Sequence, residues 1–249
     1  MRIEHRGLTD VGQKRSHNED SFLVNADLGL FVVADGMGGH AGGGTASRIA
    51  VEVIERILLD RRAQAGGPFE SNEPLASSPL AALLREAVEA ASSSIYEHAR
   101  RDHVLAGMGT TVTALLLHET YAFFGHVGDS RAYLYRDGYL DQITEDHSVV
   151  NEQLRAGLIT EDEARSSKFK NIITRSVGFE ERVLVDVMAV AVEPKDTFIL
   201  CSDGLTNFVS DEELAAAATL PVEEIPSKLI HLANERGGDD NITVIAVRT

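Results

Sequence analysis

The stretch that decides the predicted fold is Leu30-Phe-Val-Val-Ala-Asp35-Gly-Met-Gly-Gly-His40. Five apolar residues in a row predict a strand that is buried on both faces. An acid follows the strand directly, and the glycines after it allow a sharp turn and a close approach of the backbone. Because a buried carboxylate is costly without a partner or a cation, this run predicts the edge of a functional site.

Two further acids stand at the ends of apolar runs. Asp203 follows a run that starts at Thr197, and Asp240 precedes the final run from 241 to 247. Carboxylates, backbone carbonyls and retained waters are the ligands that Mg²⁺ and Mn²⁺ prefer. An Asp-Gly pair alone means only a turn, as the hairpin predicted at Asp137-Gly138 indicates. The joint occurrence of acids beside buried strands is what favours a metal site.

The composition limits the classes of partner. The chain has 249 residues, enough for a sizeable core, and its 39 acidic and 23 basic residues leave a net charge of -16. We therefore expect no nucleic-acid partner, since nucleic-acid binding needs a basic patch. The N-terminus lacks an apolar signal core and no run approaches a membrane span, so we expect a soluble, cytoplasmic protein with no membrane partner.

The only cysteine, Cys201, excludes a disulfide within the chain and a cysteine zinc site. It lies in an apolar run and is interpreted as a small buried residue. A nucleophilic role is disfavoured, because cysteine-dependent phosphatases carry an Arg six positions later and this chain has Asn207 there.

The hydrophobic pattern predicts one domain, 1–249, in which tight hairpins join several strands. Strands are expected at 22–25, 28–34, 110–117, 121–127, 131–135, 139–143, 183–192, 197–202 and in the final run. Helices are expected over 46–58, 80–95, 211–219 and 224–235, with two short polar helices within 148–166. Residues 62–79 are expected to form a flexible loop. Tight hairpins favour packed sheets with outer helices over a parallel, doubly wound sheet.

A polar cluster, Arg15-Ser-His-Asn-Glu19-Asp20, precedes the first of these predicted strands. It is equally compatible with an ordinary polar loop and with a site in which the two acids serve a metal. In the second interpretation Arg15 presents a bidentate fork to a phosphate group. Three histidines outside this argument, His17, His126 and His147, are interpreted as structural or surface residues, because none is paired at metal-ligand spacing.

Eight motifs occur in a definite order along the chain. They are Arg15-x-x-Asn-Glu-Asp20, Val33-Ala-Asp-Gly-Met-Gly-Gly-His40, Gly107-Met-Gly-Thr-Thr111, Gly125-His-Val-Gly-Asp-Ser-Arg131, Thr144-x-Asp-His-Ser148, Ile173-Thr-Arg-Ser-Val-Gly178, Leu200-Cys-Ser-Asp-Gly204 and Asp240-Asn241. Together they resemble the motifs of the type 2C, metal-dependent serine/threonine protein phosphatases (the PPM family), in their bacterial form. The resemblance extends from about Thr9 to Val247.

The resemblance implies an α+β fold, a four-layer αββα sandwich of two mainly antiparallel sheets flanked by helices. It also implies two core Mn²⁺ or Mg²⁺ ions at one end of the sheets, with room for a third. Residues 146–178 would form a flap beside the site that helps to select substrates.

The residue roles follow from the same resemblance. Asp35 would bridge the two core ions and the Gly36 carbonyl would ligate one of them, while Asp203 and Asp240 would complete the protein ligands of the other. The remaining assignments are Arg15 for the phosphoryl group, Asp129 with Asp203 for the third ion, and Glu19 and Asp20 acting through metal-bound waters.

Two positions depart from the family pattern. Eukaryotic relatives carry a His directly after the Asp-Gly as the presumed general acid, and this chain has Met37 there. His40 is a candidate substitute, and a metal-bound water is the alternative. In the flap, Ser167-Lys168 stands where many bacterial members have His-Pro.

The resulting hypothesis is hydrolysis of phosphoserine and phosphothreonine in proteins by a metal-activated water, with no phosphoenzyme. The partners would be phosphorylated proteins, including a cognate bacterial Ser/Thr kinase and its substrates, and the protein would act as a monomer. One alternative is a non-catalytic regulator that binds phosphoproteins, which predicts that the metal acids are lost. Another is a phosphatase of a single anti-sigma antagonist, which expects appended sensor segments. Hydrolysis of a small phosphomonoester also stays open.

Overall fold

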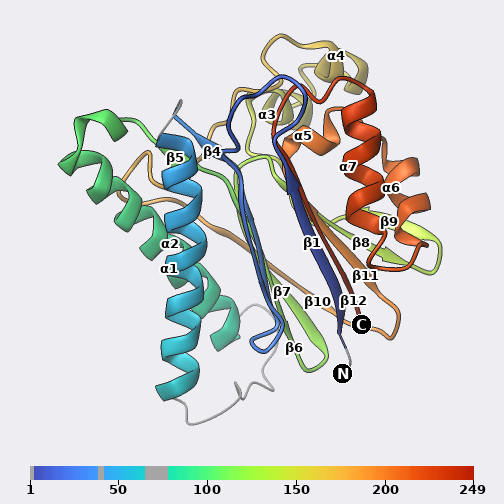
Figure 1. The fold of residues 1–249 in the computed structure, drawn as a ribbon, viewed down its shortest axis with the longest axis horizontal. Helices are drawn as coiled ribbons and strands as arrows, with labels where there is room; N and C mark the ends of the chain where they lie inside the picture. The colour runs from blue at the N-terminus through green and yellow to red at the C-terminus, as the bar shows by residue number, and fades with distance from the viewer. Residues whose placement is uncertain (1–2, 39–41, 65–77) are drawn as a thin grey trace.

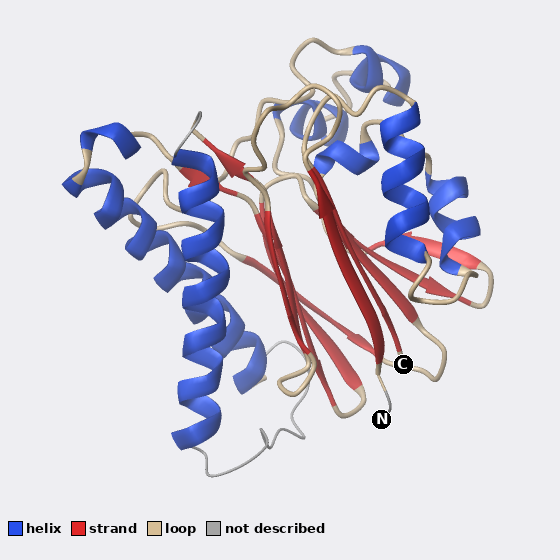
Figure 2. Ribbon diagram, viewed as in Figure 1, coloured by secondary structure: helices blue, strands red, loops and turns tan. Residues whose placement is uncertain are grey.

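Two five-stranded sheets lie face to face, and helices cover the outer face of each (Figure 1; Figure 2). The computed structural model describes residues 3–38, 42–64 and 78–249. The order of layers, helices, sheet, sheet, helices, confirms the α+β sandwich that the sequence predicted.

Every pair of named strands in the described residues is antiparallel. The first sheet has the order β1 (Glu4–Asp10), β12 (Ile242–Arg248), β11 (Thr197–Cys201), β8 (Arg131–Arg136) and β9 (Tyr139–Gln142). The second has the order β10 (Asp186–Ala191), β7 (Tyr121–Val127), β6 (Val112–His118), β3 (Leu30–Ala34) and β2 (Ser21–Asn25). A short pair joins β4 (Gly36–Met37) to β5 (Gly109–Thr110).

The helices divide between the two outer layers and residues 146–178, the segment that the sequence predicted as a flap and that is called the flap below. The second sheet is covered by α1 (Gly42–Gln64) and α2 (Pro79–Arg101), and α2 leads into a 3-10 turn, η2 (His103–Leu105). The first sheet is covered by α5 (Asp203–Thr206), α6 (Asp211–Ala218) and α7 (Ile225–Glu235). The flap contains α3 (Val149–Arg155) and α4 (Glu161–Ser166). None of the described helices is long and apolar enough to cross a membrane.

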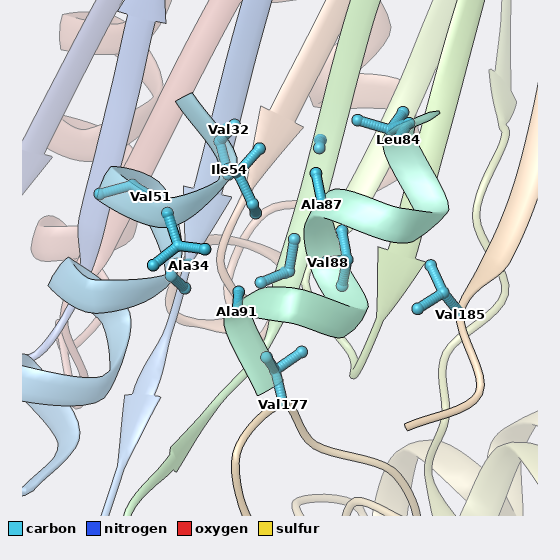
Figure 3. Packing of buried hydrophobic residues seen from close by; sticks show 14 of the residues in the cluster. Val32, Ala34, Val51, Ile54, Leu84, Ala87, Val88, Ala91, Val177 and Val185 are labelled. Atoms are coloured by element: carbon cyan, nitrogen blue, oxygen red, sulfur yellow. The ribbon is translucent and has the colours of Figure 1, made fainter. Parts of the chain in front are cut away.

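Strand β3 is apolar throughout because both of its faces are buried. Val32 and Ala34 belong to the core beneath α1 and α2, beside Ile54 and Ala87 (Figure 3). Phe31, on the opposite face, belongs to the core between the two sheets. Successive side chains of a strand point to opposite faces, so a strand with a core on each side needs an unbroken apolar run.

The first sheet follows the same rule. In β11, Ile199 packs with the helices α5 to α7, whereas Phe198 and Leu200 face the second sheet. The Phe198 ring lies 6.0 Å from the Phe124 ring of β7, centroid to centroid, which joins the two sheets through their aromatic side chains.

Helix α1 is longer than the sequence predicted. The loop expected over 62–79 begins later, because α1 continues to Gln64, and α2 already includes Pro79. The extra turn of α1 is held by an ion pair of Arg61 with Glu86 on α2 (2.9 Å). It is also held by Arg62, which donates to the Asp27 carbonyl (2.7 Å). The rest of that loop, 65–77, lies outside the described residues.

Strand β1 lies outside the ranges predicted for strands. Most of its side chains are exposed or only half-buried, so it lacks an apolar run. It forms by pairing with β12 along its whole length, from Glu4 opposite Arg248 to Asp10 opposite Ile242. An edge strand of this kind is defined by its partner rather than by its own pattern.

We expect Leu84→Ala to lower the free energy of unfolding by about 2–5 kcal/mol. The Leu84 side chain is fully buried, and it packs over Gly125 of β7, where an added Cβ would lie 3.0 Å from Leu84 Cγ. Leu59→Ala on the exposed face of α1 is the matched control, and it should change stability by less than about 0.5 kcal/mol. Urea unfolding measures both, and equal losses would contradict the described packing.

Candidate active site

The antiparallel register of the second sheet brings two of the predicted acids to one end. Ser21, the first residue of β2, pairs with Ala34, the last residue of β3. Asp20 and Asp35 are the residues just beyond this pair, so they lie at the same end of the sheet.

Three more acids, which flank strands of the first sheet, lie at one end of that sheet. Cys201, the last residue of β11, pairs with the first residue of β8 and the third residue of β12. Asp203 therefore follows β11 at the end where Asp129 precedes β8 and Asp240 precedes β12. The charges of Asp20, Asp129, Asp203 and Asp240 all act on the carboxyl group of Asp35.

Two threonines, Thr110 and Thr111, hold the backbone of Asp35. The sequence analysis identified them only as part of a family motif. The Asp35 N–H donates to Thr111 Oγ1 (2.9 Å), and the Thr111 N–H donates to the Asp35 carbonyl (2.8 Å). That carbonyl also accepts from Thr110 Oγ1 (2.9 Å). These three bonds fix where the acid leaves β3, and no local pattern around Asp35 could have indicated them.

Gly36 is required by a close approach of backbones. A Cβ at this position would lie 2.1 Å from the Gly43 carbonyl oxygen and 2.5 Å from that of Glu19. The sequence predicted a close approach of the backbone at this glycine turn. In the structure, Gly36 packs closely against the N-terminal end of α1 and the loop that carries Glu19. The metal-ligating role of the Gly36 carbonyl stays a prediction.

Asp20 and Glu19 each carry an oxygen that no described group satisfies. Asp20 Oδ2 accepts from Ser202 Oγ (2.9 Å) and from Thr243 Oγ1 (2.6 Å). Asp20 Oδ1 and Glu19 Oε1 are buried without a hydrogen-bond partner among the described residues. Because buried polar atoms are nearly always paired, these two oxygens fit a cation or its waters.

The charge state of the cluster reflects burial and mutual repulsion. Burial is the larger cause that raises the pKa of Asp35 well above its usual range, and the neighbouring carboxylates add to it. The same causes raise the pKa of Asp20 to about 7 and that of Asp129 to about 8. Burial also raises the pKa of Asp203, with Asp240 the largest charge effect. Each carboxylate is therefore costly to ionise unless a positive charge joins the cluster.

The donor set suits a hard divalent cation that keeps part of its water. Among residues 3–38, 42–64 and 78–249, no three His, Cys, Asp or Glu side chains converge closely enough to hold an ion directly. Mg²⁺ in particular is usually held by one or two carboxylates and several waters, so a loose gathering of carboxylates fits it. Mn²⁺ accepts the same oxygen ligands. Soft or zinc-type sites are disfavoured, because no thiolate or imidazole of the described residues belongs to the cluster.

Arg15 lies at the site, paired with one of the acids. Its Nη2 donates to Asp240 Oδ2 (2.8 Å), and both side chains are partly exposed. Asn241 secures this corner: its Nδ2 donates to the carbonyls of Val11 and His17, and its Oδ1 accepts from the Glu19 N–H (2.8 Å). The polar cluster at 15–20 is thus part of the site, which favours the second of its two interpretations.

His147 links the loop of Asp129 to the flap. The Gly128 N–H donates to His147 Nδ1 (3.1 Å), so Nε2 carries the proton that faces Asp186 Oδ2 (3.1 Å). The His147 carbonyl accepts from the Thr174 N–H (2.7 Å) in the returning part of the flap. Burial lowers the pKa of His147, and that of its neighbour His126 to about 4. Both are neutral, buried structural histidines, as the sequence suggested.

The remaining candidate residues from the sequence analysis lie in different environments. His17 is exposed, with its Nδ1 2.8 Å from Ser16 Oγ. Met37 pairs with Gly109 in the β4–β5 ladder. Burial raises the pKa of the Cys201 thiol to about 12, which fits an inert core residue. His40 lies outside the described residues.

A cleft of about 840 Å³ begins at Asp129 and Asp203 and runs between the flap and the helices α5 and α6. Asn207 bridges its near end: its Nδ2 donates to Asp203 Oδ2 (3.2 Å), and its Oδ1 accepts from Lys170 Nζ of the flap (3.2 Å). The site is therefore accessible to a ligand larger than a phosphate ion. Sequence reasoning gave Asn207 no role in the site.

We expect Asp129→Asn to stabilise the metal-free protein increasingly as pH rises. Folding raises the pKa of Asp129 from an ordinary 3.8 to about 8. The carboxyl group therefore destabilises the folded state increasingly as pH rises from about 4, and most above pH 8, where it is ionised in the folded protein. The difference in Tm from the wild type should be near zero at about pH 4 and largest at about pH 9. It should amount to about 2–4 °C for each kcal/mol of repulsion removed.

Thermal unfolding in the presence of EDTA measures this difference, with Asp137→Asn in the exposed hairpin as the matched control. Adding Mn²⁺ should raise the Tm of the wild type, because a ligand that binds only the folded state stabilises it. A pH-independent difference would contradict the raised pKa of Asp129.

Comparison with known proteins places these observations in a family. The family model for protein phosphatase 2C matches residues 11–240. The chain is 38% identical to the serine/threonine phosphatase stp of Listeria monocytogenes, over 99% of this chain and 95% of that protein. It is also 38% identical to protein phosphatase PhpP of Streptococcus pneumoniae, over 96% and 95% of the two chains.

Solved structures agree with the sequence relatives. The serine/threonine phosphatase PstP/Ppp of Mycobacterium tuberculosis has a TM-score of 0.88 at 35% identity, with 99% of this chain and 98% of that chain covered. The catalytic domain of PstP in complex with two manganese ions has a TM-score of 0.85 at 35% identity, with 99% and 97% covered. The strand register, the carboxylate cluster and these matches lead to one conclusion: the chain belongs to the protein phosphatase 2C family of serine/threonine phosphatases.

Proposed function

We propose that this protein hydrolyses phosphoserine and phosphothreonine in other proteins, at a site where carboxylates hold Mn²⁺ or Mg²⁺. The observation that carries the proposal is the cluster of carboxylates, in which the pKa values of Asp20 and Asp35 are raised. In addition, Asp20 Oδ1 and Glu19 Oε1 are buried without a hydrogen-bond partner among the described residues. The neighbour crystallised with two manganese ions supports the number and kind of the core ions.

In this proposal Asp35 and the Gly36 carbonyl serve the core ions together with Asp203 and Asp240, and Glu19 and Asp20 act through bound waters. Asp129, whose pKa is raised by the charge of Asp203, would serve a third ion with it. Bound there, the ions would activate a water as the nucleophile and neutralise phosphate oxygens, without a phosphoenzyme.

Arg15 is proposed to bind the phosphoryl group. Its guanidinium contacts Asp240 through one nitrogen only, which leaves further N–H donors directed away from this carboxylate. A planar fork of donors matches two phosphate oxygens at once. If Asp240 serves a core ion, its carboxylate would hold Arg15 less tightly, and the Arg15 guanidinium would be available to the phosphoryl group.

The proton donor to the leaving serine or threonine is proposed to be His40. Met37 cannot donate a proton, although it occupies the position of the presumed general acid in eukaryotic relatives. A water near the ions is the alternative donor.

The proposed partners are phosphorylated proteins, with a cognate Ser/Thr kinase and its substrates among them, and the protein is proposed to act as a monomer. The net charge of -16 supports a chain that stays soluble and repels its own copies.

We expect Asp35→Asn and Asp203→Asn each to lower Mn²⁺-dependent turnover of a phosphothreonine peptide by about 100-fold or more. Each change removes a negative charge from the cluster while it keeps the side-chain shape. Steady-state kinetics measures the loss, and calorimetric titration with Mn²⁺ should show weaker binding in both variants.

Asp137→Asn is the matched control for these two changes. Asp137 is also followed by glycine, but it lies in the β8–β9 hairpin with φ 51°, a conformation that Asn tolerates. Full activity of this variant, together with full activity of Asp35→Asn, would refute the proposed function.

We expect Arg15→Lys to lower kcat/KM for the same peptide by about tenfold, the loss of one charge-assisted hydrogen bond. Lys keeps the charge but cannot present a planar fork. Arg6→Lys, on an exposed position of β1, is the control and should leave kcat/KM unchanged. An unchanged KM and kcat in Arg15→Lys would remove Arg15 from the proposed phosphate site.

A further inference from the structure

The loop that carries Asp129 is held on both sides by two consecutive residues at the start of the flap. On one side, Asp146 accepts from Arg131 in a two-point ion pair, with Nη2–Oδ2 2.7 Å and Nε–Oδ1 2.9 Å. On the other side, the His147 N–H donates to the Gly128 carbonyl (2.8 Å), and the Gly128 N–H donates to His147 Nδ1 (3.1 Å). Because Gly128 directly precedes Asp129, the position of this acid depends on the His147 ring.

The His147 ring can accept from the Gly128 N–H in only one of its two neutral forms. Nδ1 must be the nitrogen without a proton, so Nε2 must carry the proton. Burial lowers the pKa of His147, which disfavours the ring with a proton on both nitrogens. Nε2 lies 3.1 Å from Asp186 Oδ2. Because an ionised carboxylate only accepts hydrogen bonds, Asp186 favours the form of the ring that the Gly128 contact requires.

Arg175, from the returning part of the flap, fixes which oxygen of Asp186 faces the ring. Its Nη1 donates to Asp186 Oδ1 (2.9 Å), which leaves Oδ2 for His147. Arg175 Nη1 also lies 3.3 Å from His147 Nε2, but both of these nitrogens carry protons, so they do not form a hydrogen bond. Each oxygen of Asp186 therefore receives one donor.

The sheet holds this group of side chains in place. Asp186 is the first residue of β10 and pairs with His126 near the end of β7. The His126 ring is buried, with its Nε2 3.0 Å from the Glu145 carbonyl oxygen, and it lies 4.9 Å from the His147 ring, centroid to centroid. The His147 ring therefore packs on a fixed neighbour, and its hydrogen bonds decide what it offers to Gly128.

We propose that Asp186 is a positioning residue that keeps the proton of His147 on Nε2. Through Nδ1 and the Gly128 N–H, the ring in this form fixes the loop that presents Asp129 to a metal ion. The effect on the ion rests on the proposed function, whereas the effect on the ring exists in the metal-free protein. An ion pair of Asp186 with Arg175 that only joined the flap to β10 would require no particular form of His147.

Asp186→Asn separates these two roles. Arg175 only donates, so the new amide oxygen would take the place of Oδ1 and the amide nitrogen would face His147 Nε2. Because the amide nitrogen also donates, Nε2 would lose its proton and Nδ1 would gain one. Nδ1–H and the Gly128 N–H would then be two donors facing each other, and the hydrogen bond that holds the loop would break.

Nuclear magnetic resonance of the metal-free protein in EDTA shows which ring nitrogen carries the proton and how fast the Gly128 amide exchanges. Asp186→Asn should move the proton to Nδ1 and speed this exchange by about threefold to tenfold, the loss of one hydrogen bond. Arg175→Met should change neither, because Asp186 still accepts from Nε2. Asp186→Asn/Arg175→Met should restore both, since the amide oxygen is then free to face Nε2.

Calorimetric titration with Mn²⁺ measures the consequence for the ion. Asp186→Asn should raise the Kd of the most weakly bound Mn²⁺ by about threefold to tenfold, less than the loss of about 10–100-fold typical of a group that contacts a metal ligand directly. Asp141→Asn is the matched control, because β9 is an edge strand of the first sheet as β10 is of the second. It removes the same charge at an exposed position and should keep the Kd of the wild type. Circular dichroism melting checks that all variants fold.

Four results would overturn the inference while the proposed function stands. They are a wild-type ring with its proton on Nδ1, an Asp186→Asn ring with its proton still on Nε2, an unchanged Kd for Mn²⁺ in that variant, and equal effects of Arg175→Met and Asp186→Asn. A wild type that binds Mn²⁺ but hydrolyses no phosphopeptide would refute the proposed function alone, because none of these measurements uses turnover. A wild type that binds no Mn²⁺ would refute both.

Discussion

The active end of this protein depends on keeping several carboxylates together, out of water and close enough to repel one another. Burial and neighbouring charges raise the pKa of Asp20, Asp35, Asp129 and Asp203, so ionisation of the cluster opposes folding. The rest of the fold has to outweigh that repulsion until a cation joins the cluster. Proteins commonly lose stability at a functional site in this way, because the function requires the destabilising arrangement.

The sandwich supplies the opposing stability. Three apolar layers, one between the sheets and one under each group of helices, hold the strands in a fixed register. Hydroxyl groups at the strand ends then fix the acids, with Thr111 on the backbone of Asp35 and Ser202 with Thr243 on the carboxylate of Asp20. Asp35 and Asp20 are thus held by hydroxyl groups that form hydrogen bonds without adding charge, so a bound cation would supply the positive charge that offsets these two carboxylates.

The flap and the acid cluster share one anchor. His147 accepts from the Gly128 N–H beside Asp129, faces Asp186 of β10, and bonds the returning segment of the flap through its carbonyl. Gly128 has φ +113°, and a Cβ there would lie 2.6 Å from the Thr111 side chain, so this loop has little freedom of its own. The wall of the cleft and the loop that carries one of its acids are therefore positioned by the same neutral, buried imidazole.

The sequence by itself determined which strands are buried on both faces, and it identified the acids that follow or precede them. The hydrophobic pattern of consecutive residues indicates which strands are buried, because a strand that is buried on both faces needs an unbroken apolar run. Tertiary structure alone decided that Arg15 pairs with Asp240, 225 positions away, and that Thr111 holds Asp35, 76 positions away. It also decided that the acidic first turns of α4 and α6 line one cleft. Partners this far apart meet only after the sheets have packed, so no local pattern encodes them.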